Sequence, residues 1–336
     1  MTLTKTGRGT QVLAGANSFT GLTTILGGTL QIGNGAAGTL NGATGTGLTF
    51  SGSGMFTVSE ASGVSQGMGA LNFSAGEGTV ESTNNGGNSF LSFTSMPARS
   101  AGATRNFKVT NGTNGTDNSI TLTGQGAGYI DQGSFFGGSS YAWMNGAGTY
   151  VRGIDYTIGT GDTGAYTTGG TSTIAPTGVA NGGGATLHVR TTGVISAQSS
   201  AAFTTLNIAG DNAFTLVNGA TLTVNGILKS GNNGSPTLIS GGTQIQPGAA
   251  AEWVVRDDQA SDALTIGTPL ATNGASTLVP TLPITAIAVT TIRPAIRAYS
   301  NTSPPRSSFI NRVIRFFMPQ HSNSLETKAS ALKDPC

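Results

Sequence analysis

The chain has 336 residues, of which 53 are glycine and 12 are proline, and its formal net charge is +2. Hydrophobic residues make up 37% and charged residues only 9%, so the composition excludes chains that are disordered through low hydrophobicity and high net charge. The single cysteine, Cys336, excludes an internal disulfide framework.

From Leu3 onward, short runs with alternating side chains recur along residues 1–274, and Gly, Asn or Asp closes most of them. Such period-two runs predict β-strands. They often follow one another after about seven to twelve residues, which leaves no room for crossover helices and excludes α/β folds. A sandwich, a closed barrel or a solenoid remains. Gly-Thr-Leu/Gln phrases return at Gly9, Gly28, Gly38 and Gly242, and such repetition favours an all-β solenoid.

Residues 3–35 resemble the autotransporter-associated β-strand repeat, a motif of bacterial passenger regions and large surface proteins. The residues that carry the resemblance are Leu3, Lys5, Gly7, Gly9, Thr10, Leu13, Gly15, Asn17, Phe19, Gly21, Thr23, Thr24, Ile25, Gly28, Thr29, Leu30, Ile32 and Gly33. Residues 36–274 are similar to the spacers between such repeats. Two positions depart from the pattern: Gln11, where an apolar residue is usual, and Leu22, where glycine is usual.

The resemblance implies that residues 1–274 form a right-handed parallel β-helix. Within the motif, we expect an inner face formed by Leu13, Phe19, Ile25, Leu30 and Ile32. The outer face is expected to carry Thr10, Thr24 and Thr29, and glycines turn the corners because positive φ costs glycine little. Gln11 predicts weaker packing of the first coil.

Residues 129–166 form an aromatic-rich segment that we expect to be a loop or small subdomain. Eight aromatic residues lie in it, among them Tyr141, Trp143 and Tyr150. Exposed aromatic rings stack on sugars, so these three residues are the candidate glycan contacts. The alternative is that the rings pack over the solenoid, since large apolar side chains mostly serve burial.

Three motifs with chemical associations have simpler explanations in this sequence. Gly159–Gly164 spells the dinucleotide fingerprint and Gly63–Gly67 the nucleophile elbow, but both motifs need a strand-to-helix unit. The acidic cluster Asp257, Asp258 and Asp262 is interpreted as a solvated turn beside Arg256, with a cation site or catalytic pair as the alternative. We therefore expect no catalytic residue, cofactor or metal.

Residues 275–336 differ from the body of the chain because they contain no glycine and are basic. Proline at positions 280, 283 and 294 removes backbone donors from a ladder. We expect this tail to be poorly ordered, apart from a helical turn around residues 309–317, or to be the product of a frameshift. The solenoid is expected to end near Gly274.

The sequence thus predicts a non-enzymatic surface or secreted β-helix, acting as a stalk, spacer or adhesin of a larger autotransporter-like bacterial protein. The alternative is a β-helical carbohydrate-active enzyme, a polysaccharide lyase or hydrolase. Expected partners are glycans or other cell-surface molecules and neighbouring repeats of the parent protein, with neither nucleic acid nor membrane insertion. The chain shows no export signal and is expected to be a fragment.

Overall fold

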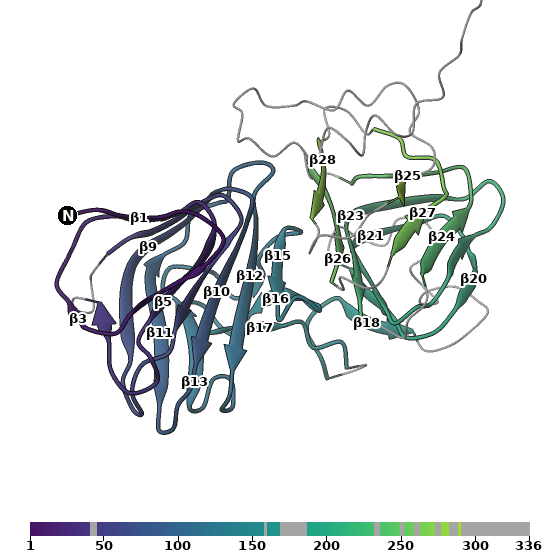
Figure 1. Cartoon of the computed structure of the whole chain (residues 1–336). Helices are drawn as coiled ribbons and strands as arrows, with labels where there is room; N and C mark the ends of the chain where they lie inside the picture. Colours follow the sequence, from purple (N-terminus) through teal and green to yellow (C-terminus); the bar gives the residue numbers. More distant parts are fainter. Residues whose placement is uncertain are drawn as a thin grey trace, which may run out of the picture. The chain divides into compact units, whose positions relative to one another are not determined.

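The computed structural model describes residues 1–40, 46–157, 160–168, 187–231, 236–248, 252–258 and 263–272, together with the strands 277–281 and 288–289. These residues form 29 strands and no helix. Parallel sheets stack into a β-solenoid of about nine turns, as the sequence predicted (Figure 1). Among the described residues, no helix is long and apolar enough to cross a membrane. The described residues all belong to one compact unit.

The first part of the solenoid is built from two main parallel sheets, which receive strands alternately along the chain. The six-stranded sheet contains β1 (Leu3–Lys5), β4 (Thr23–Ile25), β7 (Leu48–Ser51), β9 (Gln66–Ala75), β11 (Ser89–Ser95) and β13 (Asn118–Leu122). The parallel strands of the facing sheet are β2 (Thr10–Leu13), β5 (Gly28–Ile32), β8 (Gly54–Val58), β10 (Glu77–Thr83), β12 (Thr104–Thr110) and β15 (Ser134–Phe136). A small sheet pairs β3 (Ala16–Asn17) with β6 (Thr39–Leu40).

The second part repeats this arrangement. One sheet contains β18 (Ala165–Thr168), β19 (His188–Thr191), β21 (Ala201–Ala209), β23 (Thr221–Ser230), β26 (Glu252–Asp257) and β28 (Thr277–Thr281), with β25 (Gln244–Gln246) beside β23. The other contains β20 (Ile195–Gln198), β22 (Phe214–Leu216), β24 (Thr237–Gly241), β27 (Leu264–Ile266) and β29 (Ala288–Val289). Below, the first stack means residues 3–136 and the second stack residues 165–289.

Inside each stack, apolar side chains of successive coils lie in register. In the first stack Ile25 pairs with Phe50, and Phe50 pairs with Phe73. The rings of Phe50 and Phe73 are stacked with centroids 5.1 Å apart and planes 6° from parallel. Each coil therefore covers the apolar row of the next, which is how a solenoid is stabilised without a single central core.

The expected inner and outer faces of the repeat are confirmed. Ile25, Leu30 and Ile32 have no exposed surface, and Leu13 and Phe19 are partly buried against the same core. The outer face shows Thr10 exposed and Thr24 and Thr29 half-buried. Gln11 is exposed in β2, an edge strand of the described sheet, so the departure that the sequence flagged lies on the least covered coil.

Glycine is required where corners of neighbouring coils touch. Gly33 has φ +82°, and a Cβ at this position would lie 2.3 Å from the carbonyl oxygen of Ser59 in the next coil. Any other residue would be strained and would push the two coils apart. This contact explains one source of the high glycine content.

Parallel pairing continues past Gly274, where the sequence predicted the solenoid to end. Strand β28 pairs with β26, and β29 pairs with β27. Pro280 lies in β28, the last described strand of its sheet, and an edge strand tolerates a missing backbone donor. The expected helical turn at residues 309–317 and the frameshift lie outside the described residues.

Candidate functional site

The parallel ladder of the first stack ends in an antiparallel meander. Strand β15 pairs in parallel with β12 on one side and antiparallel with β16 (Ser140–Met144) on the other. Strand β16 also pairs antiparallel with β14 (Gly128–Tyr129) and β17 (Val151–Gly153). Gly137 and Gly138 have φ +61° and +76° and make the tight turn between β15 and β16. This meander is the aromatic-rich segment that the sequence singled out.

Aromatic side chains of the meander pack on the outer face of the second stack. A separate buried cluster contains Phe135, Tyr141, Ile154, Tyr156, Leu228 and Val254. Leu228 in β23 and Val254 in β26 belong to the second stack and point away from its own core, which contains Ile227 and Val255. Tyr141 has no exposed surface. The segment therefore joins two stacks through apolar packing.

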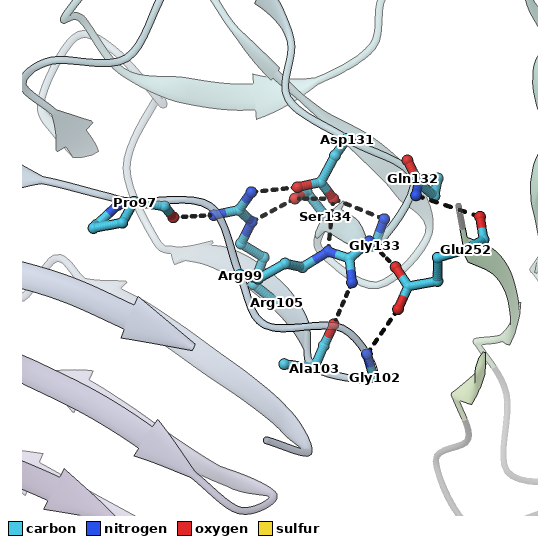
Figure 2. Close-up of polar contacts among 10 residues, drawn as sticks. All are labelled: Pro97, Arg99, Gly102, Ala103, Arg105, Asp131, Gln132, Gly133, Ser134 and Glu252. Atoms are coloured by element: carbon cyan, nitrogen blue, oxygen red, sulfur yellow. Dashed lines mark hydrogen bonds and ion pairs between the residues drawn. The ribbon is translucent and has the colours of Figure 1, made fainter. Parts of the chain in front are cut away.

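A network of charged side chains also links the two stacks (Figure 2). Asp131 accepts a hydrogen bond from Arg99 Nε at 3.0 Å and forms an ion pair with Arg105. Arg99 also forms an ion pair with Glu252 of β26. Glu252 Oε1 accepts from the backbone N–H of Gly102 at 2.7 Å. Two arginines and two carboxylates thus compensate one another, and one carboxylate comes from the second stack.

Backbone and hydroxyl groups satisfy the remaining atoms of the network. Arg105 Nε donates to Ser134 Oγ at 2.6 Å, and Arg99 Nη1 donates to the carbonyl of Ala103 at 2.7 Å. Both arginine side chains are nearly buried, at 6% and 4% exposure for Arg99 and Arg105. Buried charges with this many partners favour one geometry, because a displaced group would lose its partners without regaining water.

The electrostatic balance of the network is visible in the pKa values. Burial by itself would raise the pKa of Asp131, but Arg105 and Arg99 lower it. Burial opposes the charged form of Arg99 as well, yet Asp131 and Glu252 raise its pKa. The pKa of Arg105 is lowered, with burial as the largest cause and Asp131 acting against it. The arginines and Asp131 therefore stabilise one another's charged forms against the cost of burial.

Asp257 and Asp258 do not form a solvated turn, which corrects that interpretation: Asp257 is buried in a strand, and Asp258 lies against Gly138 of the meander. Arg256 and Asp257 lie in strand β26 and are buried. The guanidinium of Arg256 lies 4.6 Å from the centroid of the Phe135 ring and pairs with Glu77. This stretch is polar in sequence, but Phe135 and Glu77, the residues that bury Arg256, are more than 100 positions away along the chain. Asp262 lies outside the described residues.

An open cleft of about 540 Å³ lies between the meander and the start of the second stack. Its walls include Tyr129, Trp143, Asn145, Arg152, Asp162 and His188. Strand pairing sets Tyr129 opposite Trp143 on β14 and β16. The His188 ring of β19 packs against both, at centroid distances of 4.4 Å to Tyr129 and 5.9 Å to Trp143.

Two polar elements line the cleft beside these rings. Arg152 Nη1 and Nη2 donate to the two carboxylate oxygens of Asp162, each at 2.6 Å, and Asp162 raises the pKa of Arg152. His188 Nδ1 lies 2.9 Å from Thr205 Oγ1, and burial lowers the His188 pKa to about 4. The imidazole is therefore neutral at neutral pH.

The structure places the three candidate glycan residues in three different environments. Tyr141 is buried in the apolar junction and offers no ring face to a sugar, so packing is its role. Trp143 is half-buried and lines the cleft. Tyr150 is half-buried and covers Gly115, where an added Cβ would lie 2.3 Å from its ring. Trp143 is the one of the three that lines the cleft.

The other motifs form no catalytic arrangement within the described part of the chain. Ser65 of the nucleophile-elbow pattern accepts a hydrogen bond from the Phe90 backbone, and no helix follows it. Gly161–Gly164 lie in a turn, and Gly159 and His321 are outside the described residues. In this part of the chain, no three His, Cys, Asp or Glu side chains gather as for a metal ion.

Sequence reasoning missed Arg99, Arg105, Asp131 and Glu252 as a group. They are separated by up to about 150 residues, so no local pattern joins them. A weak signal existed in the sequence: charged residues are only 9% of the chain, and Arg99 and Arg105 are the two arginines that lie closest together within residues 1–290.

The comparisons with known proteins place one repeat in this chain. Residues 3–32 match the family model described as the passenger-associated-transport-repeat. This match confirms the resemblance to autotransporter-associated repeat proteins. No curated protein and no solved structure matches the chain significantly.

Proposed function

We propose that this chain is a non-catalytic segment of a bacterial passenger, acting as a stalk or adhesive spacer of a secreted or surface-displayed protein. The observation that carries the proposal is continuity: the coil type matched at residues 3–32 as a passenger-associated-transport-repeat extends into a β-solenoid of about nine turns. A passenger-type β-helix fits both findings. The same repeat supports location outside the cell.

The physical properties of the stack suit a spacer. Each coil contacts mainly its neighbours, so length is gained by adding coils without enlarging a core. The inner rows, such as Leu30, Phe56 and Val80, are paired coil by coil and have no exposed surface. Neighbouring repeats of a longer protein are proposed partners, because β1 and β2 are edge strands of the described sheets.

A carbohydrate-active enzyme is the second candidate, since Arg152, Asp162 and His188 meet in the cleft. Glycoside hydrolysis usually needs two carboxyl groups that flank the bond. Asp162 supplies the one carboxyl side chain among the described residues that line this cleft, and it is held by Arg152. The arrangement therefore favours binding over bond cleavage.

A display experiment tests the stalk. The full chain, carrying an N-terminal epitope, replaces the passenger of an unrelated autotransporter. We expect the epitope on the cell surface and a protease-resistant β-rich body. A matched variant, Phe56→Asp, places a charge in the inner row and is expected to lose the resistant body. Retention inside the cell, or an unfolded displayed chain, contradicts the proposal.

A degradation assay tests the second candidate separately. The purified full chain is incubated with a set of polysaccharides, and new reducing ends and unsaturated products are measured. We expect neither. If products form and Asp162→Asn abolishes them, the chain is an enzyme and the spacer proposal is wrong.

A further inference from the structure

We propose that the cleft lined by Tyr129, Trp143, Asn145, Arg152, Asp162 and His188 binds a neutral glycan. The proposal rests on the adhesive part of the proposed function and specifies both the site and the class of ligand. It singles out a different set of residues from the glycan contacts expected from the sequence, of which only Trp143 lies here.

Rigid elements hold the walls of the cleft. Tyr129 and Trp143 are partners in an antiparallel pair, and His188 lies in β19, which pairs with β18 and β21. A cleft of about 540 Å³ falls within the range of about 300–1,000 Å³ typical of small-molecule sites. The ligand would therefore meet a preformed surface and lose little affinity to ordering of the protein.

Trp143 supplies the apolar contact that a sugar ring needs. The His188 ring meets it edge-on, with planes at 87°, and the residue remains half-buried at the cleft wall. Gly128 faces the six-membered part of the indole, where an added Cβ would lie 3.7 Å from Cζ2. Any side chain at 128 would start to cover the indole. Aromatic faces with a polar surround suit the C–H face of a pyranose.

Polar groups at the same wall suit the hydroxyl groups of a sugar. The Arg152–Asp162 pair is bidentate, and Arg152 Nε donates to Asn145 Oδ1 at 2.9 Å. These bonds fix the orientation of the exposed Asn145 amide, whose Nδ2 is a donor. The carboxylate of Asp162 also accepts from the backbone N–H of Asp155 at 2.7 Å, so about one of its four lone-pair sites remains as an acceptor.

The charge of the cleft argues for a neutral ligand. Arg152 and Asp162 cancel each other, and His188, with its pKa lowered to about 4, is uncharged at neutral pH. An acidic sugar or a phosphate would lose water on entering without gaining an unpaired counter-charge, which is costly. Purely apolar ligands would in turn leave the polar wall without partners.

The test begins with the purified full chain on an array of neutral, sialylated and sulfated glycans. We expect retention of neutral glycans only. The best neutral glycan is then titrated while tryptophan fluorescence is recorded. The chain has two tryptophans, and Trp253 is buried in the core of the second stack, so a change that persists in Trp253→Phe reports Trp143.

Variants separate the cleft from its surroundings. Trp143→Ala is expected to weaken binding tenfold or more, whereas Tyr150→Ala, outside the cleft, leaves the affinity unchanged. If Trp143→Ala lowers the urea midpoint, the exposed Asn145 is replaced by Ala as the test variant. We then expect a severalfold loss of glycan affinity. Preferred binding of acidic glycans, no retained neutral glycan, or unchanged affinity in both cleft variants overturns the proposal. A chain that is displayed and folded but binds no glycan refutes this site alone, whereas a chain that fails display refutes the stalk.

Discussion

The two stacks differ in how their outer faces are covered. In β5 of the first stack, only the inner residues Leu30 and Ile32 are buried, and the residue between them is half-exposed. In β26 of the second stack, all six residues are buried. Both strands belong to parallel sheets of the same solenoid type. The difference arises because the antiparallel meander covers the outer face of β26.

This comparison shows where period-two reasoning is sufficient and where it fails. The stacking of coils determines that one face of each strand is apolar and buried. The residues on the other face can be polar or apolar unless a neighbouring segment covers them. At the junction, the second face carries Val254 and Arg256, which contact residues of the first stack. The junction therefore adds specific contacts to a fold otherwise held by repetition.

The largest expected effect comes from breaking the charged network between the stacks. Asp131→Asn removes the carboxylate paired with Arg105 and leaves Arg99 with Glu252, and removing a partner from a buried ion pair costs about 3–5 kcal/mol. We expect the free energy of unfolding, measured by urea denaturation, to fall by about this amount. Asp155→Asn, at an exposed position, is the matched control and should change it by less than about 0.5 kcal/mol.

If Asp131→Asn proves as stable as the control, the network contributes no more than surface charges do. A second variant sharpens the comparison. Glu252→Gln removes the one carboxylate of this network that comes from the second stack, and we expect the stacks to unfold in two separate transitions where the unaltered chain shows one.

The second prediction uses two buried titratable groups, one in each stack. Glu60 is buried, neither carboxylate oxygen has a hydrogen-bond partner among the described residues, and burial raises its pKa to about 7. His188 is buried, with its pKa lowered to about 4. Shifts of this size correspond to about 3 kcal/mol each.

The two groups act in opposite directions. For Glu60, the folded chain binds the proton more tightly, so stability is lost as the pH rises from about 4.5 to about 7. For His188, the unfolded chain binds it more tightly, so stability is lost as the pH falls from about 6.5 to about 4. Between about pH 4.5 and 6.5, their effects on the free energy of unfolding largely cancel.

Urea midpoints measured from pH 4.5 to 8 separate these contributions. We expect Glu60→Gln to stabilise the chain at pH 8 and to expose the loss due to His188 below pH 6.5. In His188→Gln only the Glu60 effect remains, so the urea midpoint should rise as the pH falls. Parallel pH profiles of the unaltered chain and both variants would show that neither group is shifted.

The smallest expected effect concerns the packing surface itself. Gly226 lies on the outer face of β23, where an added Cβ would be 2.8 Å from Tyr141 Oη and 3.2 Å from Gln132 Cβ. Overpacking of this kind costs about 1–3 kcal/mol, so Gly226→Ala should lower the free energy of unfolding by that amount. Gly9→Ala, with no atom within 4 Å, should have little effect. Equal effects would mean that the stacks are not packed together at Gly226.

Much of the solenoid could be predicted from sequence because its information is local. The resemblance of residues 3–35 to the repeat, of which the family model matches residues 3–32, placed Ile25, Leu30 and Ile32 inside. The cleft could not be predicted, since its walls come from β14, β16, β17, β19 and the turn at 161–163. Of its lining residues, Trp143 was expected as a glycan contact, but its neighbours His188 and Asp162 were not.

The sequence by itself determined the strands, the corners and the inner rows, because alternation and glycine placement act over a few residues and each coil repeats the last. Only the tertiary structure decided that Arg256 is buried, that Tyr141 is a packing residue, and that Glu252 meets Arg99. Those outcomes depend on which outer face is covered by a distant segment. No local pattern records that choice, because a residue on an outer face is free to be polar or apolar until a partner lies against it.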